Sequence, residues 1–156
     1  MRIGVYIDGY NLYYGGRGIC GRSTAGWRWL DIMSLAKNLV SAHSRWIDPT
    51  IEMVTYCTAR ISGASNPQGQ REQDVYLRAL EQSGAVTHIA VGNYVARIAT
   101  APLAVASHLL IDVLTRAIGA ALAISSDSDL AFPINYVRDL VPVGLISPKS
   151  RKPPKW

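Results

Sequence analysis

The sequence predicts an α/β protein with a single Rossmann-like domain, in which a mostly parallel sheet of about five strands carries helices on both faces. Short apolar runs of strand length alternate with longer segments whose apolar residues recur at helical spacing. The 156 residues are enough chain for one domain with a core of its own. A content of 49% hydrophobic and 17% charged residues is typical of a globular protein and excludes a disordered one. The alternation predicts helical crossovers between parallel strands.

The expected strands are five short apolar runs, bounded by residues that favour turns or helices. They cover residues 2–7, 51–57, 87–91, 120–125 and 143–146. The first run ends at Asp8-Gly9, a pair that commonly ends a strand and begins a turn.

Four segments between these strands have helical character. They cover residues 27–40, 70–83, 104–117 and 130–140. Gly84 follows the second segment as a helix-ending glycine, and Pro133 falls in the first turn of the last, where proline is tolerated. Residues 15–26, rich in glycine, and the polar residues 62–69 are expected to be loops. Residues 1–148 therefore form the domain, and residues 149–156 form a basic tail.

Composition bounds the location and the partners. The net charge is +5; four basic residues lie in the tail, which leaves +1 for residues 1–148. The tail is expected either to contact phosphates or to be a solvated end. No apolar run reaches the ~18–20 residues that cross a bilayer, and the start lacks the features of a signal peptide, so we expect a cytoplasmic protein without a membrane partner. Two cysteines are too few for a disulfide framework or a zinc site.

Aspartates follow two of the expected strands. Asp8 comes directly after the first strand, and Asp127 and Asp129 come just after the fourth. In parallel sheets, ligands bind outside the carboxyl ends of the strands, near the topological switch point. Asp112 lies on the helix before the fourth strand, within an apolar stretch where a carboxylate needs a partner. Because clustered carboxylates repel one another unless a cation neutralises them, the set predicts a divalent-metal site.

Structural interpretations of the same aspartates remain open. Asp127 and Asp129 both suit the N-terminal cap of the following helix, and Asp129 is the expected cap. Asp112 pairs with Arg116 in the alternative interpretation, since residues four apart are neighbours on a helix. Asn11 is able to cap the turn after the first strand.

Two segments carry a family resemblance: residues 7–13 (Ile-Asp-Gly-Tyr-Asn-Leu-Tyr) and residues 125–130 (Ser-Ser-Asp-Ser-Asp-Leu). Residues 70–77 and 109–112 add to it. With the strand and helix alternation between them, these segments resemble the NYN domain, the LabA-like (DUF88) proteins of the PIN-like nuclease superfamily. The resemblance covers most of the chain, and its specificity comes from the two segments together.

The resemblance implies a Rossmann-like sheet and a ribonuclease that depends on Mg²⁺ or Mn²⁺. Asp8 and Asp127 would be the principal metal-site carboxylates, and Asp112 and Asp129 would complete the site. Asn11 would orient Asp8 or contact the phosphate. Carboxylate oxygens are the ligands that Mg²⁺ prefers, and a bound metal activates water for attack on the scissile phosphate.

The expected partner is RNA, single-stranded or structured. Arg60 and Arg71 flank the loop at residues 62–69 and are expected to contact phosphates, while Tyr13 lies among aromatic residues suited to stacking on bases. The resemblance leaves a homodimer open.

One departure from the family pattern bears on activity. The family usually carries a further metal-site acid just before the helix with Asp112, at about Pro102 here, yet no carboxylate lies between Glu81 and Asp112. A shortened loop that lacks its acidic element, or a catalytically weak or inactive RNA-binding module, is therefore the alternative to an active nuclease. A small phosphoester hydrolase ranks lower; no glycine-rich or Walker motif supports a nucleotide cofactor.

Overall fold

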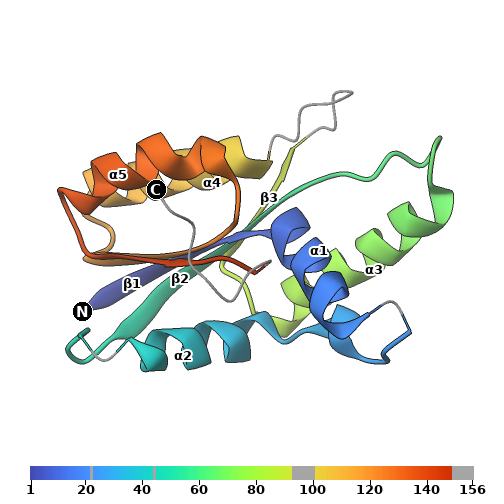
Figure 1. Cartoon of the computed structure of the whole chain (residues 1–156), viewed down its shortest axis with the longest axis horizontal. Coiled ribbons are helices and arrows are strands. Elements are labelled where there is room, and N and C mark those ends of the chain that lie inside the picture. Colours follow the sequence, from blue (N-terminus) through green and yellow to red (C-terminus); the bar gives the residue numbers. More distant parts are fainter. Residues whose placement is uncertain (22, 44, 93–100, 149–156) are drawn as a thin grey trace.

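The computed structural model of the protein, which describes all residues except 22, 44, 93–100 and 149–156, has a five-stranded sheet in the order β3-β2-β1-β4-β5 (Figure 1). The strands are β1 (Arg2–Asp8), β2 (Thr50–Ala59), β3 (His88–Gly92), β4 (Ala120–Ile124) and β5 (Val143–Ile146). Each neighbouring pair is parallel, as the α/β prediction requires. The expected bounds of all five strands lie within two residues of these.

Helices cover both faces of this sheet, and Figure 1 shows two layers of helices with the strands between them. They are α1 (Gly9–Cys20), α2 (Ile32–Ala42), α3 (Pro67–Ser83), α4 (Ala101–Leu114) and α5 (Ala131–Arg138), with 3₁₀ turns η1 (Trp27–Trp29) and η2 (Ser128–Leu130). One core cluster joins the sheet to α2 and α3, and the other joins it to α4 and α5. Within the described residues, no helix combines the length and apolar character needed to cross a membrane.

The central strands divide the core between the two faces. Ile3, Val5 and Ile7 of β1 belong to the cluster with α2 and α3, whereas Tyr6 belongs to the other. This alternation follows from the two-residue period of a strand. All five residues of β4 are buried, the pattern of a central parallel strand that is covered on both faces. The chain leaves β1 for β2 on one side and reaches β4 on the other, so the switch point lies between β1 and β4.

The helix α1 was not expected: the sequence predicted a turn after the first strand and a loop over residues 15–26, whereas α1 runs from Gly9 to Cys20. Glycine has low helix propensity, but tertiary packing overrides it here. A Cβ at Gly15 would lie 2.5 Å from the Pro148 carbonyl oxygen, and one at Gly9 would lie 2.6 Å from the Tyr56 hydroxyl. These two glycines let α1 approach its neighbours closely, a signal that helical periodicity does not contain.

The predicted helix at 27–40 is divided in two. Trp27–Trp29 form a 3₁₀ turn, and α2 begins only at Ile32. Asp31 determines this start, since its carboxylate accepts hydrogen bonds from the Ser34 backbone N–H at 2.9 Å and the Ser34 hydroxyl at 2.7 Å.

The other helices differ from expectation mainly at their ends. α3 begins three residues early, with Asn66 as its cap and Pro67 in its first turn. Gly84 ends it with a φ of +66°, which confirms the expected C-terminal glycine. α4 lies three residues before its predicted bounds. The expected basic tail at 149–156 lies outside the described residues.

Candidate functional site

Two aspartates meet where the central strands end. Asp8 is the last residue of β1, and Asp127 follows β4 by three residues. Ile7 of β1 is paired with Ile124 of β4, so the residues that follow the two strands begin at the same level of the sheet. Both carboxylates therefore lie at the switch point, where parallel sheets place their ligands.

Asp8 is fully buried and held by three hydrogen bonds. Its Oδ1 accepts from the Asn11 backbone N–H at 3.0 Å, and its Oδ2 accepts from the Asn11 amide Nδ2 at 2.5 Å. The Ser125 hydroxyl donates to the same Oδ2 at 3.2 Å. Asp8 thus caps α1 and is fixed in orientation by groups from both α1 and the end of β4.

Asn11 and Ser125 connect the two strand ends. The Asn11 amide oxygen accepts from the Ser126 backbone N–H at 3.3 Å, and the Ser125 hydroxyl accepts from the Asp127 backbone N–H at 3.1 Å. Asn11 contacts Asp8 with its amide NH2 and the loop after β4 with its amide oxygen, while the Ser125 hydroxyl makes both contacts itself. The role expected for Asn11, orienting Asp8, matches this geometry.

Asp127, and not Asp129, caps the turn after β4. Its Oδ1 accepts from the Asp129 backbone N–H at 3.0 Å, whereas Asp129 is exposed and supplies only its N–H to this contact. The expected cap at Asp129 is therefore wrong. Asp127, two positions earlier, has the extended backbone that an N-terminal cap requires.

Burial raises the pKa of the Asp8 carboxyl above its usual range, because desolvation disfavours the charged form. The hydrogen bonds from Asn11 and Ser125 act in the opposite direction and lower this pKa, while the nearby charge of Asp127 raises it further. The two carboxylates are close enough to repel each other. A cation between them would relieve both the desolvation and the repulsion.

The raised pKa makes the stability of the protein depend on pH. Below the ordinary aspartate pKa of about 4, Asp8 is protonated in both the folded and unfolded states. As pH rises through the interval up to its folded pKa, the folded state binds more protons, so the free energy of unfolding falls. In EDTA, Asp8→Asn is therefore expected to gain stability relative to the wild type from about pH 4 upward until a plateau. Urea denaturation of both proteins between pH 4 and 7 measures this difference; a difference that does not change with pH would contradict it.

The structure does not bring Asp112 to this pair, which corrects the expectation of a four-carboxylate site. The Tyr6 hydroxyl donates to Asp112 Oδ2 at 2.8 Å and lies beside Gly4, where an added Cβ would be 2.7 Å from it. Gly4 lies four positions before Asp8 on β1, about 13 Å along the strand. The alternative pairing with Arg116 is also absent among the ion pairs of the described residues.

Asp8 and Asp127 consequently remain as a pair. Across the part of the chain that the structure describes, no three His, Cys, Asp or Glu side chains gather closely enough to share one metal ion. Pro102, which stands at about the position where the family usually carries a further acid, is buried in the first turn of α4.

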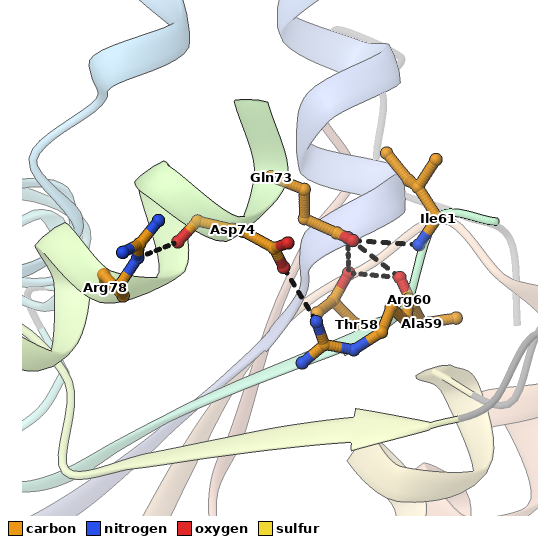
Figure 2. Close-up of polar contacts among 7 residues, drawn as sticks. All are labelled: Thr58, Ala59, Arg60, Ile61, Gln73, Asp74 and Arg78. Atoms are coloured by element: carbon orange, nitrogen blue, oxygen red, sulfur yellow. Dashed lines mark hydrogen bonds and ion pairs between the residues drawn. The ribbon is translucent and has the colours of Figure 1, made fainter. Parts of the chain in front are cut away.

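Of the three expected RNA contacts, Arg60 is already engaged. Its Nη1 lies 2.7 Å from Asp74 Oδ1, and Figure 2 shows this ion pair beside the hydrogen bonds of Gln73. The Gln73 amide accepts from the Ile61 backbone N–H at 2.9 Å and donates to the Ala59 carbonyl at 2.8 Å. Arg60 and Gln73 therefore fasten α3 to the end of β2, a structural role that sequence analysis did not anticipate.

The other two expected contacts remain accessible. Arg71 is exposed on the first turns of α3, where it donates to the Gln68 side chain at 3.3 Å. Tyr13 projects from α1 and packs against Trp27, with ring centroids 5.4 Å apart.

Replacing Asn11 with alanine is expected to lower any activity of the site by about 10- to 100-fold, the usual effect of removing a group that orients a metal-binding carboxylate. The change removes one hydrogen bond to Asp8 and the acceptor for the Ser126 N–H. Initial rates of RNA cleavage would measure it, with Asn135→Ala on the exposed side of α5 as the matched control. Equal rates for the two variants would contradict the role given to Asn11.

Comparisons with known proteins support the fold of this chain and give no information on its activity. No family model and no curated protein matches this sequence. Among solved structures, the chain is similar to VPA0982, a protein of unknown function from Vibrio parahaemolyticus. The TM-score is 0.58 at 15% sequence identity, over 92% of this chain and 79% of the other. At that identity, the likeness establishes that the two proteins share one Rossmann-like α/β fold.

Proposed function

We propose that the protein is an endoribonuclease that depends on a divalent cation and cleaves RNA at the carboxyl edge of β1 and β4. The observation that carries the proposal is the Asp8–Asp127 pair at the switch point, in which a buried carboxylate lies beside a second one. Neither carboxylate forms an ion pair with a basic residue that the structure describes, and adjacent carboxylates of this kind repel each other and are useful as cation ligands. The resemblance of the two surrounding segments to the NYN domain supports the same reaction.

The residues present fit Mg²⁺ or Mn²⁺ held through few protein ligands. Mg²⁺ commonly binds through one or two carboxylates and keeps waters or substrate phosphate oxygens as its other ligands. Asp8 and Asp127 would supply the carboxylates. When bound, such a cation lowers the pKa of a water and stabilises charge on a phosphate.

The remaining groups position these carboxylates. Asn11 and Ser125 fix Asp8 in one orientation, and the Ser125 hydroxyl also accepts the backbone N–H of Asp127. α1 begins immediately after Asp8, so the positive end of its dipole favours a phosphate at this edge. The site therefore combines fixed anionic ligands with a helix end that attracts the substrate.

Labelled RNA incubated with the protein and Mn²⁺, and in parallel with EDTA, tests the proposal. Internal cleavage that requires the cation supports it. Cleavage unaffected by EDTA would overturn it, as would turnover of a mononucleotide ester in preference to RNA, which would identify a small phosphoester hydrolase.

A second candidate is an RNA-binding module that keeps the fold without the chemistry. It is favoured by the pairing of only two acids in the described residues and by the lack of a carboxylate between Glu81 and Asp112. RNA binding at micromolar protein, with intact RNA after prolonged incubation in Mn²⁺, would decide for it.

A further inference from the structure

A cleft of about 840 Å³ lies beside the Asp8–Asp127 pair, between α1, η1, the end of β2 and α3. Gly9, the residue after Asp8, forms part of its wall. The cleft differs from the acidic pair in its chemistry, because many of its lining side chains are aromatic. They include Tyr13, Trp27, Trp29, Tyr56 and Tyr76.

Two rings of this aromatic cleft, those of Tyr13 and Trp29, remain exposed, while Tyr56 at its base belongs to the core. Trp29 and Tyr76 meet at 67° with centroids 6.1 Å apart, and Tyr56 meets Tyr76 at 72° and 6.2 Å. Such edge-to-face contacts are a preferred arrangement of aromatic pairs and hold these rings in place. Trp29 is 59% exposed and Tyr13 is 38% exposed, although large aromatic side chains usually find cover in a folded protein. The cleft thus offers stacking surfaces to a flat ligand.

One charged side chain of the cleft indicates what else the ligand carries. Arg17 lines the cleft, lies 6.0 Å from the Tyr14 ring, and has no carboxylate partner among the described residues. The other arginine of the cleft, Arg28, is paired with Glu72 at 3.3 Å. An unpaired cation at the edge of a cleft suits a phosphate.

We infer that the aromatic cleft is a base-binding subsite, which holds an unpaired nucleobase of RNA while the adjoining backbone passes Gly9 toward Asp8. The identification of the ligand as RNA rests on the proposed function. Bases inside an A-form helix are stacked and inaccessible, whereas bases of single strands and loops turn outward onto aromatic side chains. The subsite therefore selects unpaired RNA, and it accepts all four bases because each has a stacking face.

RNA binding measured without a metal ion tests this subsite independently of catalysis. In EDTA, fluorescence anisotropy would compare a labelled single-stranded RNA octamer, the same octamer with abasic residues, and the octamer in a duplex. Stacking contributes about 1–3 kcal/mol per base, so loss of the bases or of one stacking ring is expected to weaken binding by roughly 5- to 150-fold. The expected result is weaker binding of the abasic and duplex forms.

Two variants locate the effect. Tyr13→Ala and Trp29→Ala remove exposed rings of the cleft and leave the two core clusters intact. Each is expected to weaken binding of the single strand by the same roughly 5- to 150-fold. Tyr136→Ala, at a residue that is 49% exposed on α5 outside the cleft, is the matched control and is expected to bind as the wild type does.

The inference is overturned if abasic, duplex and single-stranded RNA bind equally, or if both cleft variants bind as tightly as Tyr136→Ala. Cleavage in Mn²⁺ is read separately. Base-dependent binding without cleavage would retain the subsite and remove the proposed nuclease. Metal-dependent cleavage with base-independent binding would retain the nuclease and remove the subsite.

Discussion

Asp8→Asn is expected to abolish metal-dependent RNA cleavage, with a loss of more than about 100-fold. Altering a group that only orients a metal ligand already costs about 10- to 100-fold, and this substitution removes the ligand charge itself. The amide has nearly the same shape as the carboxylate, although its NH2 group cannot accept the hydrogen bonds that Asn11 and Ser125 donate to Asp8. Initial rates at saturating Mn²⁺ measure the effect.

The control for this prediction is Asp139→Asn, which removes one exposed carboxylate at the end of α5. Prepared identically, it is expected to cleave at the wild-type rate, so a contaminating nuclease would show in both preparations. Cleavage by Asp8→Asn at the rate of Asp139→Asn would remove the site from the proposed mechanism.

The part of the candidate site that sequence analysis predicted depends on strand ends. Asp8 and Asp127 each follow a short apolar run, and the carboxyl ends of parallel strands share one edge of a sheet. Chain order alone therefore placed these carboxylates together. The contacts of Asn11 follow equally from its position three residues after Asp8, in the first turn of α1.

Asp112 was misplaced because periodicity does not say toward which edge a helical residue lies. α4 runs back from the end of β3 to the start of β4, antiparallel to the strands. Asp112 comes eleven residues after Ala101, about 16 Å along the helix. Just beyond it, the Arg116 carbonyl accepts from the Arg2 side chain at the beginning of β1. A site residue on a crossover helix is thus expected in its first turn and not in its last.

The aromatic cleft shows a different limit of sequence analysis. Its walls come from α1, η1, the end of β2 and α3, segments that span residues 9 to 76. The sequence indicates basic and aromatic residues near the first strand. It does not predict α1, the helix that forms one wall of the cleft, because its glycines favour a loop. The close approach of Gly9 to Tyr56, which seats this helix, is a tertiary property.

Leu122→Ala is expected to cause the largest loss of stability, about 2–5 kcal/mol of the 5–15 kcal/mol typical of a domain. Leu122 is fully buried on β4, opposite Val5 of β1, and a Cβ added at Gly144 would lie 2.9 Å from its Cδ1. Its removal leaves a cavity between the two strands that carry Asp8 and Asp127. Urea denaturation measures the change as a lower midpoint at constant slope. Leu140→Ala, at a residue that is 52% exposed, is the control and is expected to shift stability by no more than about 0.5 kcal/mol.

The comparison of Leu122→Ala with Asp8→Asn separates the contribution of core packing to stability from the contribution of the Asp8 carboxylate to activity. Backbone pairing between β1 and β4 continues through Leu122 and maintains the register of the strand ends, so the folded fraction of Leu122→Ala is expected to cleave RNA at the wild-type rate. Asp8→Asn is expected to abolish cleavage in a protein that stays folded, since it removes the charge required for the reaction and leaves the core clusters intact. Loss of activity in fully folded Leu122→Ala would mean that the positions of the carboxylates depend on core packing as well as on strand register.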